Sequence, residues 1–323
     1  MKGTYHICLS SHQEVLFRSE VDLIIGFNYL AVTALETDSA LLADGFLSTH
    51  HHEVARTDDP RTLARRSRYA YTRYFNAKYH RRGSLGEKEC FILHVDGLYH
   101  TQALLNYVIR QGLHHGMAAT PFGYKHCSAN SFFREELGKA GTPQLIDDEK
   151  RHRFLPYNTT VPRKYRMNSE GLLLREDIED TAYVENVYVS PRNFLFQMNR
   201  ISDDRDILDQ QKENSLPAVT LEAVERGVPG FNPSKVFIAE QGRVNRNRMT
   251  DIDLCHIIDD IILPSRYFKG AAGSSIYLLS ESKRAEIGNS IWKEYRAVQF
   301  QKCDSPFSGK VITEEQIRRC LCI

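Results

Sequence analysis

The pattern of hydrophobic and polar positions over the first 120 residues predicts a regular order of strands and helices. Apolar residues recur at helical spacing in residues 21–35, and Pro60 opens another helical stretch because proline suits a first turn. Two strands joined by a turn at Asp44-Gly45 are expected within residues 41–54. The remaining predicted elements are strands at 4–9 and 89–95 and helices at 60–80 and 98–113. The order β-α-β-β-α-β-α predicts an α+β fold, an antiparallel sheet with packed helices.

A change of composition divides the chain near its middle. Residues 136–171 contain three prolines and many charges, which predicts a linker after a first domain at residues 1–135. Residues 172–323 have a mainly helical pattern and form the predicted C-terminal domain, whose role the sequence does not indicate. Within it, the arginine-rich residues 243–248 are expected either to contact phosphate or to form a solvated loop.

The composition is that of a globular protein without a strong charge bias. Hydrophobic residues make up 41% and charged residues 26%, and the net charge of +1 means that any nucleic-acid-binding surface must be local. The seven cysteines form no CxxC pair, which is typical of free thiols in a reducing compartment. Neither a signal peptide nor an apolar stretch of the roughly 20 residues that span a bilayer is recognisable. We therefore expect a cytoplasmic protein with no membrane partner.

Three consecutive histidines are the sharpest chemical feature of the chain. Side chains on a strand alternate between its two faces, so His50 and His52 are expected to share one face while His51 points away. Two imidazoles spaced in this way can hold one divalent ion if a third ligand comes from elsewhere in the fold. The alternative is an exposed histidine cluster with no role.

Tyr107 and Gln111 form a second candidate pair in the last predicted helix of the first domain. Four residues separate them, so they are expected to lie one above the other on a single helix face. A phenol, with a pKa of about 10, attacks phosphate usefully only beside a cation that stabilises the developing charge. A helix that presents Tyr107 with a metal-binding amide meets this requirement. The alternative is that Tyr107, one of 16 tyrosines, only packs in the core.

A basic stretch with interleaved aromatic residues lies between Arg61 and Lys88. It contains nine lysines and arginines against one acid, Glu87. Cations neutralise phosphates and aromatic rings stack on exposed bases, which is the chemistry that a single strand requires. The predicted DNA-binding residues are Arg65, Arg66, Arg68, Arg73, Lys78, Arg81 and Arg82.

In their order and spacing, these pieces resemble the single-tyrosine HUH transposases, particularly the REP-associated tyrosine transposases and their insertion-sequence relatives. The resemblance covers roughly residues 4–135. It depends on the strand Tyr5-His6-Ile7, the histidine-x-histidine strand at 50–52, the helix Arg73-Tyr74-Phe75-Asn76, the turn Gly83-Ser84-Leu85-Gly86, the strand Phe91-Ile92-Leu93 and the helix Asn106-Tyr107-Val108-Ile109.

The resemblance implies a ferredoxin-like nuclease domain that cuts and rejoins single-stranded DNA. In this implied site His50, His52 and Gln111 bind Mg²⁺ or Mn²⁺, and Tyr107 is the nucleophile that forms a 5′-phosphotyrosine intermediate. Hairpin-forming repeat DNA is the implied substrate, and a homodimer is the implied assembly. Two alternatives remain open: another HUH endonuclease of the replication-initiator or relaxase type, and a domesticated nucleic-acid-binding protein that does not cut.

Overall fold

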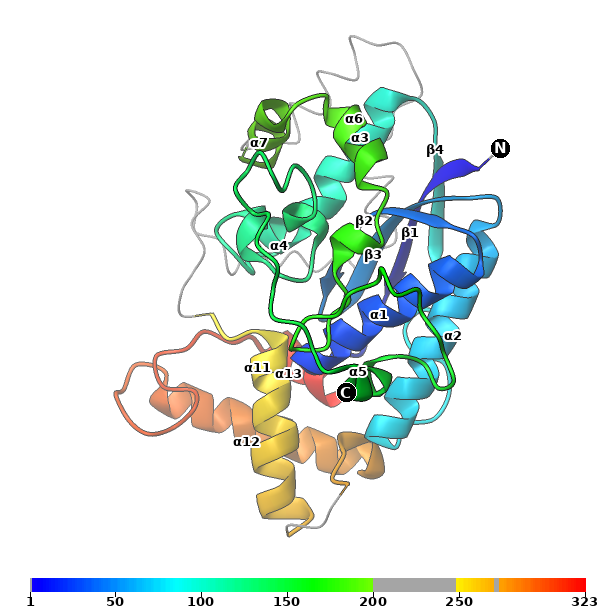
Figure 1. Ribbon diagram of the computed structural model, residues 1–323. Coiled ribbons are helices and arrows are strands. Elements are labelled where there is room, and N and C mark those ends of the chain that lie inside the picture. Colours follow the sequence, from blue (N-terminus) through cyan, green and yellow to red (C-terminus); the bar gives the residue numbers. More distant parts are fainter. Residues whose placement is uncertain (1, 200–247, 270–272) are drawn as a thin grey trace.

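A four-stranded antiparallel sheet lies at the centre of the fold (Figure 1). The computed structural model describes residues 2–199, 248–269 and 273–323. Within them the strands follow the order β2-β3-β1-β4 across the sheet. The strands are β1 (Gly3–Ser10), β2 (Ala40–Leu47), β3 (His50–Thr57) and β4 (Phe91–Val95).

Helices cover both faces of this sheet. Helices α1 (Glu20–Glu36) and α2 (Pro60–Tyr79) lie side by side on one face, and α3 (Leu98–Ile109) lies on the other (Figure 1). Alternate strand residues supply the two cores, Ile7 to the core under α1 and α2 and Val54 to the core under α3. The chain order β1-α1-β2-β3-α2-β4-α3 is ferredoxin-like. The predicted α+β fold is confirmed.

Local sequence signals set the ends of the two helices that pack together. Ser19 and Asp22 form a capping box at the start of α1, in which each side chain accepts a hydrogen bond from the other residue's backbone amide. Asp59 caps α2, and Pro60 occupies its first turn as the sequence predicted. The helix ends at His80, which adopts a left-handed conformation with φ of 55°.

Two local predictions differ from the structure. The turn between β2 and β3 lies at Ser48-Thr49, and the predicted turn at Asp44-Gly45 was wrong. Asp44 lies instead inside β2, where its two carboxylate oxygens accept hydrogen bonds of 2.8 Å from the buried guanidinium of Arg175. The helix predicted at 98–113 is also interrupted, because α3 ends at Ile109 and α4 (Gln111–His114) follows it.

Residues 136–171, which their composition predicted to be a linker, pack on the first domain. Asn28 of α1 anchors them: its amide nitrogen donates to the carbonyls of Phe154, at 3.0 Å, and Gly171, at 2.7 Å. Tyr165 and Met167 join the core beneath α1 and α2. The short helices of this region and its neighbours are η1 (Pro121–Gly123), η2 (Ser128–Asn130), α5 (Asp148–Arg151), η3 (His152–Phe154) and η4 (Arg175–Asp177).

Helices α6 (Thr181–Tyr188) and α7 (Pro191–Asn199) pack against α3 (Figure 1). Tyr188 and Phe194 are fully buried in the same core as Leu104 of α3. Residues 172–199, which the sequence grouped with the C-terminal half, therefore extend the hydrophobic core of the first domain.

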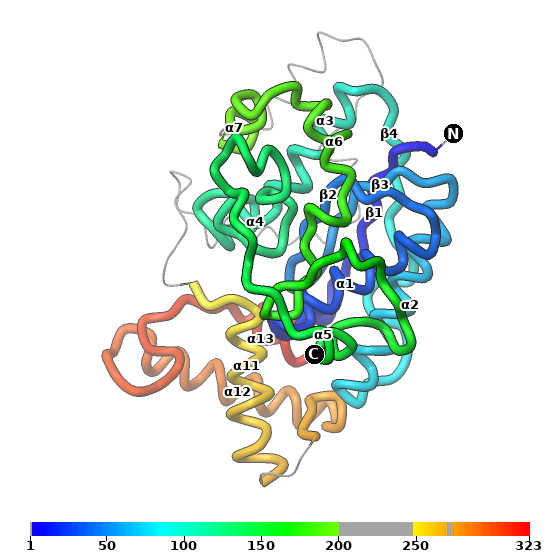
Figure 2. The backbone as a smooth tube through the Cα atoms, viewed as in Figure 1, coloured from blue at the N-terminus to red at the C-terminus, as the bar shows by residue number. Residues whose placement is uncertain are grey.

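The C-terminal helices form a separate core that docks near the start of α1 (Figure 2). Arg18, whose side chain is fully buried, donates to both carboxylate oxygens of Asp259 and to the carbonyl of Cys320. Of the arginine-rich residues 243–248, only Arg248 lies within the described part of the chain. The helices are α11 (Asp251–His256), the π-helix η5 (Ile257–Tyr267), η6 (Ile276–Leu278), α12 (Glu281–Val298) and α13 (Glu314–Leu321). None of the described helices is both long enough and apolar enough to cross a bilayer.

Candidate metal and tyrosine site

His50 and His52 lie on the face of β3 that is turned toward α3. Their ring centroids are 5.0 Å apart, and both side chains are buried. His51 faces the other side of the sheet, where its ring stacks on Phe46 at a centroid distance of 4.7 Å. The strand thus separates the three adjacent histidines into a pair on one face and a packing residue on the other.

Tyr107 of α3 lies directly against this pair. The centroid of its ring is 5.3 Å from that of His52, and the residue is 7% exposed. Gln111 begins the short helix α4, is fully buried, and donates from its Nε2 to the carbonyl of Tyr107 at 3.2 Å. Although the helix is interrupted after Ile109, Tyr107 and Gln111 remain in contact, as their spacing in the sequence predicted.

Three buried polar atoms of these side chains make no hydrogen bond of regular geometry. They are Nε2 of His50, Nε2 of His52 and Oε1 of Gln111. The side chain of Gln111 nevertheless interacts with His50 as a weak hydrogen-bond partner, which raises the pKa of His50 against the larger effect of burial. A buried polar group without a partner requires an explanation, because burial without a hydrogen bond is costly. Two imidazole nitrogens and an amide oxygen fit a divalent cation.

The other nitrogen of each imidazole already has a partner, which fixes how the ring is turned. Nδ1 of His50 lies 3.0 Å from the hydroxyl of Thr49. Nδ1 of His52 lies 2.9 Å from Nε2 of His6 on β1. Contacts of this kind orient metal-binding histidines in proteins and set which nitrogen carries the proton. In both rings Nε2 is thus the buried nitrogen that has no hydrogen bond.

Burial also keeps these imidazoles neutral, the form that binds metal. Burial lowers the pKa of His50 to about 4. Burial and the neighbouring His50 hold the pKa of His52 well below its ordinary value. At neutral pH each imidazole therefore keeps one nitrogen with a free electron pair, and the tautomer decides whether that nitrogen is Nε2.

Two further histidines contact the proposed histidine ligands, and neither was among the metal ligands predicted from the sequence. His6 contacts His52, and the ring of His115 lies 4.9 Å from that of His50. For His6 the pairing of β1 with β3 is the missing information, since it places His6 and His52 on the same face of adjacent strands. In the described part of the chain, no three His, Cys, Asp or Glu side chains are arranged to hold a metal ion. The candidate ligand set therefore depends on Gln111.

The predicted DNA-binding residues lie away from this site, on α2 and the loop after it, and α2 covers the opposite face of the sheet. Several of them have internal partners: Lys78 donates to Asp22 and Arg81 to Glu14, each at 2.6 Å. Arg68 donates to the backbone carbonyls of Leu85 and Lys88, and Arg66 pairs with Glu36. These four side chains therefore have a structural role within the fold.

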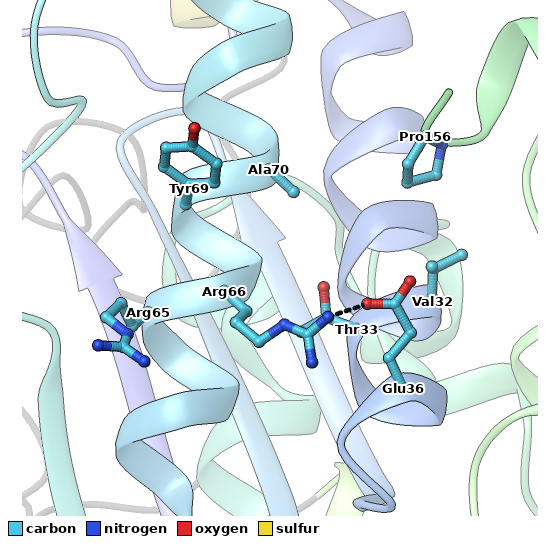
Figure 3. Close-up of a pocket in the computed structure, with 8 residues that line it drawn as sticks. All are labelled: Val32, Thr33, Glu36, Arg65, Arg66, Tyr69, Ala70 and Pro156. Carbon is cyan, nitrogen blue, oxygen red and sulfur yellow. Dashed lines mark hydrogen bonds and ion pairs between the residues drawn. The ribbon is translucent and has the colours of Figure 1, made fainter. Parts of the chain in front are cut away.

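The remaining predicted cations border two hollows of the surface. Arg65 and Arg66 line a groove of about 450 Å³ between α1 and α2, together with Tyr69 (Figure 3). Arg73 lies over the ring of Tyr69, 5.8 Å from its centroid. Arg82 lines a larger cleft of about 1320 Å³ between the first domain and the C-terminal helices. The structure does not bring these cations together with Tyr107.

The comparisons with known proteins give a distant structural likeness. No protein-family model matches the chain, and no curated protein matches its sequence. Among solved structures, the chain is similar to one described as the structure of the "REP associates tyrosine transposase bound to a REP hairpin". The identity is 11% and the TM-score 0.36, and the match covers 44% of this chain and 84% of the other. The match is thus distant and covers less than half of this chain.

Proposed function

We propose that this protein is a metal-dependent nuclease and strand transferase of single-stranded DNA, a transposase. The observation that carries the proposal is the convergence of Tyr107 with three unpartnered atoms, on His50, His52 and Gln111. A packing tyrosine requires no such surroundings. A nucleophilic tyrosine requires a cation beside it.

The proposed cation is Mg²⁺ or Mn²⁺, held by His50 Nε2, His52 Nε2 and Gln111 Oε1. When bound, it would polarise the scissile phosphate and stabilise charge on its oxygens. The chain's own groups contribute position and environment: the strand and the helix hold the ligands and the phenol within one buried space. Burial also removes competing water, which strengthens electrostatic interactions.

In the proposed reaction the oxygen of Tyr107 forms a bond to phosphorus, and the bond from phosphorus to the 3′-oxygen breaks. The phenol loses its proton and the departing oxygen gains one, so that the products are a 5′-phosphotyrosine and a free 3′-hydroxyl. Attack by another 3′-hydroxyl reverses these changes and joins strands without an external energy source, because the covalent link conserves the bond.

Single-stranded or hairpin DNA is the proposed substrate, and one chain contains every proposed reacting group. His50 and His52 come from β3 and Tyr107 from α3 of the same chain. A homodimer, if it forms, is therefore not needed to assemble this site. Its role would be to hold two DNA ends together.

A nucleic-acid-binding protein that does not cut is the second candidate. The observation that favours it is the burial of Tyr107, which is 7% exposed, so that a phosphate reaches the phenol only if neighbouring side chains move. The buried and unpartnered histidine nitrogens favour the enzyme, because a binding protein has no use for them.

Incubation with labelled hairpin DNA and Mn²⁺, followed by a denaturing gel, tests the proposal. We expect a covalent protein–DNA adduct that is lost in Tyr107→Phe and in His52→Ala. Tyr99→Phe, which removes a hydroxyl from the same helix, is the matched control and keeps the adduct. Retained DNA binding with no adduct, across Mg²⁺, Mn²⁺ and several hairpins, would establish the non-cutting alternative.

A further inference from the structure

His6 is a fully buried histidine on β1 that contacts both halves of the candidate site. Its Nε2 lies 2.9 Å from Nδ1 of His52, and the two rings are inclined by only 19°. The ring of Tyr107 meets that of His6 edge-on, at a centroid distance of 6.3 Å and an angle of 85°. Phe91 of β4 packs against its other side. His6 therefore has a defined position beside a proposed ligand and the proposed nucleophile, which also contact each other.

The contact between the two imidazoles contains one proton, and its location decides what His52 can do. If His6 donates through Nε2, a neutral His52 carries its own proton on Nε2, and that nitrogen has no electron pair for a metal. If His52 donates through Nδ1, its buried Nε2 keeps the electron pair. Only the second arrangement is compatible with a metal at the three unpartnered atoms.

We infer that His6 is a positioning residue that accepts the Nδ1 proton of His52 and thereby makes the Nε2 of His52 a metal ligand. Histidine ligands in proteins are commonly oriented by a carboxylate or a carbonyl at this position. Here the acceptor is a neutral imidazole, whose own Nδ1 is buried and has no hydrogen-bond partner. The inference deepens the proposed function, since it rests on the same metal site.

The edge contact with Tyr107 gives His6 a second effect on the site. Because the ring of His6 packs against both the ligand and the nucleophile, we expect a change in the size of residue 6 to shift one relative to the other. Small displacements of reacting groups are costly in rate, about a hundredfold for 1 Å. We therefore expect substitutions of His6 to affect the placement of the phenol as well as metal binding.

The first test measures Mn²⁺ affinity of the metal-free protein by calorimetry or by electron paramagnetic resonance, without DNA. We expect binding to weaken about 10- to 100-fold in His6→Phe, which keeps a ring but cannot accept a proton. His6→Gln, whose amide oxygen accepts, should recover affinity to within a few-fold of the unaltered protein. His94→Phe is the matched control, since His94 is an exposed histidine of β4 that packs on Tyr5 of β1.

A second measurement needs no substitution and remains informative if His6→Phe does not fold. Long-range proton–nitrogen correlation spectra of the metal-free protein report which nitrogen of His52 is protonated. We expect a proton on Nδ1 and none on Nε2. A proton on Nε2 overturns the inference, as does unchanged Mn²⁺ affinity in folded His6→Phe.

These outcomes are separable from the fate of the proposed reaction. If the unaltered protein binds Mn²⁺ and loses it in His6→Phe but forms no adduct with DNA, the positioning role stands and the nuclease function fails. If an adduct forms while His6→Phe binds Mn²⁺ normally, the function stands and the positioning role fails. Absence of Mn²⁺ binding in the unaltered protein overturns both.

Discussion

Gly45 of β2 and the backbone carbonyl of Val108 in α3 approach so closely that a Cβ at position 45 would lie 2.7 Å from the carbonyl oxygen. The same Cβ would lie 3.2 Å from Cβ of Gln111. A backbone oxygen within a helix cannot relieve such a clash by changing rotamer, as a flexible side chain can. Glycine at position 45 therefore allows the helix that carries Tyr107 to lie against the strand pair that carries the histidines.

We predict that Gly45→Ala displaces the end of α3 and weakens the site. Overpacking of this kind costs about 1–3 kcal/mol in the free energy of unfolding, which urea denaturation measures. The rate of adduct formation should fall by about tenfold or more, because Tyr107 and Gln111 move together. Gly141→Ala is the control, since a Cβ there meets nothing within 4 Å. If Gly45→Ala has the same stability and the same rate of adduct formation as the unaltered protein, the close approach of α3 to β2 is not required for the site.

A second prediction concerns the amide ligand. Gln111→Ala removes the buried Oε1 that has no partner, so we expect Mn²⁺ affinity to fall about tenfold or more. Gln111→Glu supplies an oxygen with a full charge and should bind Mn²⁺ at least as tightly as the unaltered protein. Calorimetric titration measures both. Unchanged affinity in Gln111→Ala would remove this residue from the ligand set.

A third prediction concerns the pH dependence of stability in the metal-free protein. Burial lowers the pKa of His6 to about 3 and that of His50 to about 4, against 6.5 in the unfolded chain. Below pH 6.5 the unfolded chain therefore binds protons that the folded chain does not, and stability falls as pH falls. Each histidine contributes a slope of up to about 1.4 kcal/mol per pH unit, down to its folded pKa.

Urea denaturation with a chelator present, between pH 7 and pH 5, measures this slope. His6→Phe should reduce it, because one of the neutral histidines is gone. Mn²⁺ should make the dependence steeper, since protons then compete with metal for the folded state. A flat profile over the same range would mean that these imidazoles are accessible to protons in the folded protein.

A fourth prediction distinguishes the structural role of Arg81 from a DNA-binding role of its neighbour Arg82. Arg81 donates to both carboxylate oxygens of Glu14, at 2.6 and 2.9 Å, whereas Arg82 is exposed beside the large cleft. Arg81→Ala should lower the free energy of unfolding by about 1–3 kcal/mol. Arg82→Ala should leave stability unchanged, weaken single-strand binding and reduce its salt dependence by about one phosphate contact. Fluorescence anisotropy at several salt concentrations gives the binding result, and the reverse assignment would contradict the prediction.

The period of the sequence was sufficient to predict the central sheet and its helices, because alternation and helical spacing are local properties. The Asp44-Gly45 pair was misread as a turn because that dipeptide favours tight hairpins. What keeps Asp44 within a strand is Arg175, 131 positions away, and no local pattern contains that partner. The packing of residues 136–199 on the first domain escaped prediction for the same reason.

Local spacing in the sequence also predicted part of the candidate site. Strand parity was enough to pair His50 with His52, and helical spacing was enough to pair Tyr107 with Gln111. The contribution of His6 depends on the register between β1 and β3, which only the folded sheet provides. Arginines on α2 were grouped by charge, and their ion pairs with Asp22, Glu14 and Glu36 became visible only with the partners in place.

The hydroxyl of Ser48, in the turn that leads into the histidine strand, donates to Asp251 of α11 at 2.7 Å, and Asp251 also accepts from Arg319 of α13. Helices α11 and α13 are thus attached to the turn that precedes the strand of the proposed histidine ligands. Where this contact couples cation binding to the attachment of the C-terminal helices, the coupling is reciprocal, and each strengthens the other by the same free energy. We then expect a fragment without those helices to bind metal less tightly, even with every ligand retained.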